Sequence, residues 1–430
     1  MRLYFLLILA FIFGSVFAEQ VYVKIGSPEF KKPVVALNSK CMIEGDLCPI
    51  INELEAIISS DMVLSNAFIM LPKATSPEEK DRFNVNAWKV SGAEYLVSME
   101  VNKRKITVIL VSLLNGFDVA SKTVSLMDSN IDTAHDISDF IYTKLTGEPS
   151  IFNSKVAMIC GTDSDKGKNL FVMDYDGRRI TQKTAYRGIS ISPAWSPDGK
   201  YIAYTRYTKK NYKGRGTLVN QDLVLYDVNR KRETILSDTI GQNSGAAWSP
   251  DGKSIAFTMS KENNPNIYIM DIDDKKPRLL INNIGLDVEP SFSPDGKEIV
   301  FSSTKSGNPE LYKFEIASSK QTRLTFSGYY NSSPAWSPMG DMIAFSGLDN
   351  PFGKKAYFDV FLIDPKATKI ERLTIDSGNN EDPSWSSDGR HLMYSSTRNK
   401  GSDIYMIHND GTGEKRLTTG MKCYSPSWSR

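Results

Sequence analysis

Trp195-Ser-Pro-Asp-Gly-Lys200 is the first of six copies of a short motif that recurs along this 430-residue chain. The aromatic residues that begin successive copies lie 53, 44, 44, 49 and 43 residues apart. A period in the forties is typical of β-propeller blades rather than of helical repeats. The copies begin at Trp195, Trp248, Phe292, Trp336, Trp385 and Trp428.

Each complete copy is followed by segments in which apolar residues alternate, such as Tyr201 to Tyr204 and Leu223 to Asp227. A period of two is that of β-strands packed on both faces. The Pro-Asp-Gly part of the motif favours a tight turn, because Pro restricts φ, Asp hydrogen-bonds the turn backbone and Gly accepts a left-handed conformation. With the segment before each aromatic residue, every repeat provides four strands.

The two ends of the repeat region complement each other. Lys155 to Cys160, Asn169 to Asp174 and Arg179 to Thr181 match the second, third and fourth strands of a repeat, whereas Ser425 to Trp428 supplies only a first strand. The sequence therefore predicts an all-β six-bladed β-propeller over residues 150–430, closed by pairing of 425–428 with 155–160. Closure removes exposed sheet edges. The alternative is a row of unrelated hairpins.

Residues 19–149 lack the motif, and their pattern predicts a small α/β domain with two helices on one face of a mixed sheet. Asn115-Gly116 favours a turn between two alternating segments, and Gly147 ends the last helical segment. The expected strands are 21–25, 33–37, 94–101, 106–113 and 119–126. The expected helix faces are Ile51, Leu54, Ile57, Ile58 and Met62, and Ile131, Ala134, Phe140, Ile141 and Leu145.

The first 18 residues have the pattern of a secretory signal peptide. Arg2 precedes an apolar run from Leu3 to Phe13, and Val16-Phe-Ala18 suits cleavage before Glu19. The run is too short to span a bilayer, and no later stretch is apolar enough. We expect an exported protein that resides in the periplasm.

Charge and composition argue against several classes of function. The 52 basic and 50 acidic residues give a net charge of +2, which favours neither nucleic acid nor an anionic membrane. The three histidines, His135, His391 and His408, share no short motif with cysteine, and the four cysteines lack zinc spacing. We therefore expect no metal and no cofactor.

The order of these features, with Lys144-Leu-Thr-Gly-Glu148, Asp174-Tyr-Asp-Gly177 and Ser192-Pro-Ala-Trp-Ser-Pro-Asp-Gly199, resembles the TolB family. The resemblance covers the whole mature chain. It implies a propeller that binds the lipoprotein Pal, other Tol-system or outer-membrane partners, and a role in outer-membrane integrity and cell division; we expect a monomer. It also implies contact of TolA with an N-terminal arm that contains Glu19, Gln20, Val21, Tyr22 and Val23.

Strand direction indicates which end of the propeller binds a partner. The Pro-Asp-Gly turns share one end, whereas the loops before each first strand share the other end and vary between repeats, as expected of a binding surface on a rigid scaffold. By resemblance to the family, several of these loop positions line a funnel that takes Pal; for a single residue, a solvated loop is the alternative. The candidate partner-binding residues are Gln242, Asn243, Gly245, Asp287, Val288, Glu289, Tyr329, Tyr330, Asn331, Glu381 and Asp382, in loops that also contain Arg187 and Asn380.

The segment Arg206 to Gly216 accounts for much of the longest interval between motifs and projects from the same end. It contains five basic residues and no acidic one, so it is either a solvated insertion or a partner contact. The basic residues are Arg206, Lys209, Lys210, Lys213 and Arg215.

Two other classes of function fit parts of the pattern. Related propellers gate serine peptidases, but such an enzyme needs a Gly-x-Ser-x-Gly elbow with a partnered histidine, and the sequence offers neither. A structural scaffold without a specific ligand stays open. We expect a protein that is not an enzyme.

Register places Cys160 opposite Cys423 at the ring closure. If a four-residue turn makes Trp195 face Lys200, residue 190 faces residue 205, and the two cysteines occupy the same places relative to Trp428 and Lys155. Direct cross-strand neighbours need only local adjustment to form a disulfide. A pair of small buried thiols is the alternative, and a link between Cys41 and Cys48 also stays open.

Overall fold

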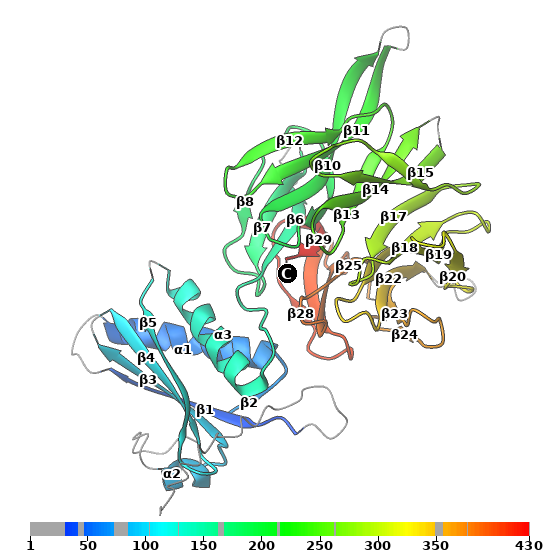
Figure 1. Cartoon of the computed structure of the whole chain (residues 1–430). Helices are drawn as coiled ribbons and strands as arrows, with labels where there is room; N and C mark the ends of the chain where they lie inside the picture. The colour runs from blue at the N-terminus through cyan, green and yellow to red at the C-terminus, as the bar shows by residue number, and fades with distance from the viewer. Residues whose placement is uncertain are drawn as a thin grey trace, which may run out of the picture.

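The computed structural model describes residues 31–41, 47–72, 85–102, 104–127, 129–161, 167–212, 216–261, 264–348, 356–375 and 377–429. In these ranges the chain forms an α/β domain followed by a six-bladed propeller (Figure 1). The predicted signal peptide, the N-terminal arm and the strand expected at 21–25 lie outside the described residues. Within these ranges, every helix is too short or too polar to cross a membrane.

Each blade is a four-stranded antiparallel sheet whose first strand lies beside the first strands of the neighbouring blades. The central parts of the second and third strands are buried on both faces, which explains successive apolar residues such as Ile299-Val-Phe301. Five blades consist of consecutive strands: β9 (Ser190–Trp195), β10 (Tyr201–Tyr212), β11 (Gly216–Asp227), β12 (Arg232–Ser237); β13 (Asn243–Trp248), β14 (Ser254–Lys261), β15 (Asn264–Asp271), β16 (Arg278–Ile281); β17 (Asp287–Phe292), β18 (Glu298–Ser303), β19 (Glu310–Glu315), β20 (Gln321–Arg323); β21 (Tyr330–Trp336), β22 (Ile343–Leu348), β23 (Phe358–Ile363), β24 (Ile370–Arg372); β25 (Asn380–Trp385), β26 (His391–Ser396), β27 (Asp403–His408), β28 (Lys415–Arg416).

The sixth blade joins the two ends of the propeller sequence. Its strand order is β29 (Lys422–Trp428), β6 (Lys155–Gly161), β7 (Asn169–Asp174) and β8 (Thr181–Gln182). The last strand therefore takes the innermost place in a blade whose other strands come first in the chain, as the strand count predicted.

A disulfide links Cys160 and Cys423 as direct partners across β29 and β6, with Cα atoms 4.1 Å apart. The pairing is confirmed, but the predicted register was wrong. Ser196 pairs with Tyr201 and Trp195 with Ile202, because the turn begins one residue later than assumed, and a bulge then makes Ser190 face Arg206. In the closing blade Trp428 pairs with Val156 and not with Lys155, and the bulge between Tyr424 and Ser427 removes this shift of one residue, so that Cys423 still faces Cys160. The side chains of Cys41 and Cys48 lie outside the described part.

The N-terminal sheet has the order β2 (Ile69–Met70), β1 (Val34–Cys41), β3 (Tyr95–Asn102), β4 (Lys105–Ser112), β5 (Asp118–Ser125). It is mixed, because β1 is parallel to both of its neighbours. Two helices, α1 (Leu47–Leu64) and α3 (Asn130–Thr146), share one hydrophobic core with it, as predicted. A short third helix, α2 (Val85–Val90), was not predicted; it buries Trp88 in a second apolar cluster.

The N-terminal domain packs against the Pro-Asp-Gly end of the propeller, and all three histidines of the chain lie in this interface. His135 Nδ1 donates to Asp61 Oδ2 at 2.9 Å, while His391 Nε2 and His408 Nε2 both donate to the Leu64 carbonyl oxygen, at 2.9 and 3.3 Å. Asp61 also accepts a hydrogen bond from the Tyr175 hydroxyl of the propeller. Among the described residues, the hydrogen bonds between the two domains lie at this end of the propeller.

Replacing both Cys160 and Cys423 by serine should lower the free energy of unfolding. The bond closes a loop with a sequence separation of 263, and loss of the chain-entropy term for so long a loop costs about 5 kcal/mol before other effects are subtracted. Guanidinium unfolding of the oxidised chain and of the double variant measures this difference. Equal unfolding midpoints and slopes would contradict a stabilising role for the bond.

Candidate binding site at the channel mouth

Each first strand carries a β-bulge three residues before its aromatic residue. In all six blades the residue at this position has a left-handed backbone, with φ between 48° and 62°. For a residue other than glycine this conformation costs of order 1–3 kcal/mol, and such strain gathers at functional sites. The six bulged residues are Ser192, Gly245, Glu289, Ser333, Asp382 and Ser425.

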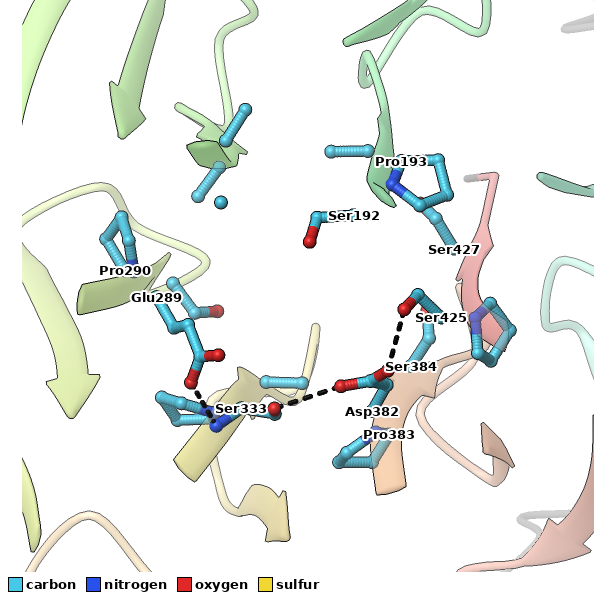
Figure 2. A pocket seen from close by; sticks show the side chains of 18 residues that line it. Ser192, Pro193, Glu289, Pro290, Ser333, Asp382, Pro383, Ser384, Ser425 and Ser427 are labelled. Atoms are coloured by element: carbon cyan, nitrogen blue, oxygen red, sulfur yellow. Dashed lines mark hydrogen bonds between the residues drawn. The ribbon is translucent and has the colours of Figure 1, made fainter. Parts of the chain in front are cut away.

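The bulged residues and the two residues after each of them line a cavity of about 250 Å³ at the centre of the ring (Figure 2). Proline follows the bulged residue in five blades and Ala246 follows it in the sixth. Because proline has no N–H group, these positions do not donate hydrogen bonds to the channel. Polar recognition in the cavity therefore depends on side chains, which are those of the bulged residues and the hydroxyl groups of Ser291, Ser384 and Ser427.

Hydrogen bonds connect four of the bulged residues around one side of the channel. The Ser333 amide donates to Glu289 Oε2 at 2.7 Å, and the Ser333 hydroxyl donates to Asp382 Oδ1 at 3.0 Å. The Ser425 hydroxyl donates to the other oxygen of Asp382 at 2.7 Å, and Figure 2 shows all three contacts. The charge of the ring is thus confined to this side, since Ser192 and Gly245 carry none.

Two carboxylates at the mouth of the channel, Glu289 and Glu381, hold their protons more tightly than ordinary carboxylates. Burial raises the pKa of Glu289 to about 7. The hydrogen bond from the Ser333 amide opposes this rise, whereas the negative charges of Asp382 and Glu381 add to it. Burial, followed by the charge of Asp382, raises the pKa of Glu381 to about 7 as well. Near neutral pH the mouth therefore holds only part of its negative charge, and a bound cationic group would favour full ionisation.

The structure separates the predicted site residues into three groups. Gly245, Glu289 and Asp382 line the channel. Gln242, Val288, Tyr329, Tyr330 and Glu381 are partly or largely exposed in the same loops and strand starts, as is Arg187. Asn243, Asp287, Asn331 and Asn380 are buried within the blades.

The buried group holds the loops in place. Asp287 accepts hydrogen bonds from the Asn283 amide at 2.8 Å and from the Ser303 hydroxyl at 2.6 Å. Asn331 Nδ2 donates to the Ser327 carbonyl oxygen at 3.0 Å. These side chains position the binding loops and do not themselves face the mouth.

Sequence reasoning missed a set of exposed apolar side chains in the loops before the first strands. Ile284, Phe326 and Ile375 are 93%, 71% and 69% exposed, values that a folded chain rarely allows for several neighbouring apolar residues unless a partner covers them. An apolar residue in an otherwise polar loop was the signal available in the sequence. The other members of the set are Ile189, Ile240 and Leu286.

The predicted basic insertion is a continuation of β10 and β11 into a long hairpin that projects beyond the other blades (Figure 1). Acidic residues outside the insertion neutralise two of its basic residues: Arg206 pairs with Glu233, and Lys210 pairs with Asp222 and Asp238. Lys209 is exposed and has no ion pair with any residue that the structure describes. Lys213 and Arg215 lie outside the described residues.

Among the described residues, three buried side chains bring potential metal ligands together: Asp61, His135 and Asp176, in the interface between the domains. The oxygens of Asp61 already accept hydrogen bonds from Tyr175, Ser138 and His135, and those of Asp176 from Arg178. The cluster is therefore built as a hydrogen-bonded joint between the domains rather than as a set of free ligands.

Comparison with known proteins identifies the family of this chain. Residues 142–430 match the family model described as the TolB beta propeller domain, and residues 21–124 match the TolB amino-terminal domain. The Tol-Pal system protein TolB of Desulfosudis oleivorans is 31% identical over 277 residues, 59% of each chain, and that of Alcanivorax borkumensis 29% over 221 residues, 49% of each chain. The matched part thus spans roughly half to three fifths of these relatives. The crystal structure of TolB from Acinetobacter baumannii has the same fold, with a TM-score of 0.78 at 24% identity over 93% of this chain and 97% of that one.

Replacing Glu289 by glutamine should change how stability depends on pH. Because the pKa of Glu289 is raised from 4.5 to about 7, its ionisation should lower the free energy of unfolding as the pH rises from about 5 to 8. The difference in unfolding free energy, variant minus natural chain, should therefore increase over that range. Urea unfolding at several pH values measures it. Asp251→Asn is the control, since the Ser249 hydroxyl holds the pKa of Asp251 below its ordinary value, outside this range. A difference that is constant with pH would contradict the raised pKa.

Proposed function

The chain belongs to the TolB family, and on that premise we propose that it is a non-enzymatic, periplasmic binding component of the Tol-Pal system. Its propeller binds the lipoprotein Pal at the channel mouth, and its mature N-terminus contacts TolA. Through these contacts it supports outer-membrane integrity and constriction during cell division. The observation that carries the proposal is the ring of strained bulges, which holds Glu289 and Asp382 in the channel at the open end of the propeller.

The arrangement of the two domains supports a partner at this end. The N-terminal domain already occupies the Pro-Asp-Gly end, where Asp61 and Leu64 accept hydrogen bonds from the propeller. The described residues of the N-terminal domain form their hydrogen bonds with the propeller at that end, which leaves the mouth for a partner of protein size. The mouth offers what protein interfaces commonly use, which is apolar anchors around a polar centre.

The positions of the histidines favour a binding protein over a hydrolase. Hydrolysis by a serine nucleophile needs a general base within hydrogen-bond reach. All three histidines direct ring nitrogens at Asp61 or at the Leu64 carbonyl oxygen, in the interface between the domains. The serines of the channel, Ser192, Ser333 and Ser425, thus have no histidine beside them. A scaffold without a specific ligand is the second candidate, and the following experiment distinguishes it.

The mature chain should bind the soluble domain of the Pal lipoprotein from its own organism with a micromolar or tighter dissociation constant, on the order of −8 kcal/mol or better. Replacing Glu289 and Gln242 together by alanine should weaken binding severalfold or more, because both contribute polar contacts to the mouth. Isothermal calorimetry measures the affinity, with Lys253→Ala at the opposite end as a control. Unchanged affinity in the double variant would remove the assignment of the mouth, and no binding by the natural chain would favour the scaffold.

Deleting residues 19–25 should abolish capture of TolA while leaving affinity for Pal within about twofold, because the arm and the mouth are separate contacts. Pull-down with the periplasmic domain of TolA and calorimetry with Pal measure the two effects. A chain in which residues 19–25 are replaced by a Gly-Ser segment of equal length controls for length alone. Retained capture of TolA by the truncated chain would contradict a contact through the arm.

A further inference from the structure

The hairpin of β10 and β11 extends beyond the first strand of its own blade (Figure 1). The first strand, β9, begins at Ser190, and the last backbone bond between this segment and β10 runs from the Tyr207 amide to the Ile189 carbonyl oxygen. Because β10 continues to Tyr212, residues 208–212 have no strand of the described chain on the side of β9. In the other five blades the described second strand ends no more than one residue beyond its last bond to the first strand. We call residues 208–212, on the side of β9, the free edge of β10.

Main-chain groups on the free edge point toward the side of the channel. In an antiparallel pair, the amide and carbonyl groups of successive residues point alternately to the two sides of the strand. The Tyr207 amide bonds Ile189 on the side of β9, and the Tyr207 carbonyl oxygen accepts from the Tyr186 hydroxyl at 2.6 Å. By the continuous register of the hairpin, the amide and carbonyl groups of Lys209 and Asn211 point to the same side. Within the described residues no backbone hydrogen bond reaches them there. Since β9 is the innermost strand of the blade, these unpaired groups border the channel mouth.

Buried polar contacts hold the extension of the hairpin in shape. Asp222 and Asn220 on β11 are 1% and 0% exposed. Asp222 accepts hydrogen bonds from the Thr208 hydroxyl at 3.0 Å and from the Asn220 side-chain amide at 2.6 Å, and it forms an ion pair with Lys210 at 2.9 Å. The side-chain oxygen of Asn220 accepts from the Gly241 amide at 2.7 Å, which attaches the hairpin to the loop before β13. A buried network whose members are paired rigidifies the backbone around it, so the free edge is presented in a fixed geometry.

Charge indicates what kind of segment the free edge accepts. Proteins commonly block an open strand edge with a proline or a β-bulge, and the described part of this hairpin has neither beyond Tyr207. The Lys209 side chain is exposed and forms no ion pair with any described residue. The sequence from 206 to 216 contains five basic residues and no acidic one, so two copies of the chain paired through this edge would oppose like charges. A segment with an acidic residue opposite Lys209 has the complementary charge.

We propose that the free edge of β10 binds an extended, acidic segment of a partner protein as an added β-strand beside the channel mouth. The amide and carbonyl groups of Lys209 and Asn211 form the main-chain bonds, and the Lys209 ammonium selects a segment with an acidic residue. The added strand takes the place that a longer β9 would occupy, so the blade gains a strand at its inner side. The proposal rests on the proposed function, because the protein bound at the mouth supplies the segment, and it adds the mode of binding and the chemistry of that segment.

Proline substitutions in one cross-strand pair of the hairpin test the proposal. Lys209 and Val219 face each other without bonding, so their amides point to opposite edges. The probe is the soluble domain of the chain's own Pal lipoprotein, and calorimetry measures its affinity. Lys209→Pro should weaken binding about tenfold, because the added strand loses a main-chain donor. Lys209→Ala keeps the amide and should weaken binding only about threefold, with a smaller salt dependence. The matched control Val219→Pro removes an amide from the other edge and should leave the affinity within about twofold.

Amide hydrogen exchange of the natural chain keeps the outcome decisive if Lys209→Pro disturbs the hairpin. When the probe is added, the amides of Lys209 and Asn211 should exchange about tenfold more slowly or slower still, and those of Val219 and Thr217 on the opposite edge should not change. Binding of the probe without protection of Lys209 and Asn211, or equal affinities of Lys209→Pro and Lys209→Ala, would overturn the added strand and leave the proposed function in place. Dimerisation of the chain that Lys209→Pro abolishes would assign the edge to a second copy instead. No binding of the probe by the natural chain would overturn both the added strand and the proposed function.

Discussion

The pairing of β29 with β6 is the constraint on which the rest of the propeller depends. It joins the last strand to a strand that begins more than 260 residues earlier, and the Cys160–Cys423 disulfide lies within it. Two further bonds close the same seam: Trp428 Nε1 donates to the Ser154 hydroxyl at 2.7 Å, and the Lys155 amide donates to the Ser429 hydroxyl at 2.8 Å. Without this pairing β6 would become a free edge and the channel would open on one side. The ring of bulges would also lose Ser425, one of the two hydroxyl groups that hold Asp382.

The two ends of the closed ring differ chemically: one end consists of nearly identical turns, and the other of loops that differ between blades. The turn end repeats almost the same residues in every blade, which makes it suited to turns and to a fixed domain joint. Asp61 is buried there and accepts three hydrogen bonds, an arrangement that is costly to break because the donors would lose their partner without water to replace it. The loop end carries the variation between blades. We therefore expect the joint to fix the scaffold at one end and a partner to bind at the other.

The sequence predicted the fold where local chemistry decides the conformation. The Pro-Asp-Gly turns, the six repeats and the mixed sheet follow from turn residues and periodicity. The disulfide was predicted although the register was wrong, because a bulge removes the error of one residue before the cysteines. The candidate site residues were chosen by their place in the loops before the first strands, which does not separate side chains that face the channel from those that face the blade. A bulge shifts the alternation by one residue, so Asn243, Asp287 and Asn331 point into the blades while Glu289 and Asp382 point into the channel. The domain joint had no local signal, because Asp61, His135 and Tyr175 are far apart in the sequence.

Backbone strain and asymmetry at the mouth have a common origin. Each bulge turns one side chain into the channel, and neighbouring blades stabilise the strained backbone: the Glu289 amide donates to the Thr258 hydroxyl at 3.2 Å and the Asp382 amide to the Ser346 hydroxyl at 3.0 Å. Once the backbone of all six blades is fixed in this way, the residue at each bulge can vary without changing the ring. Serine, glycine and two acids occupy these equivalent positions. A scaffold of repeated blades thus acquires a chemically one-sided mouth by changing single side chains, which is the least that a symmetric ring needs in order to hold an asymmetric partner.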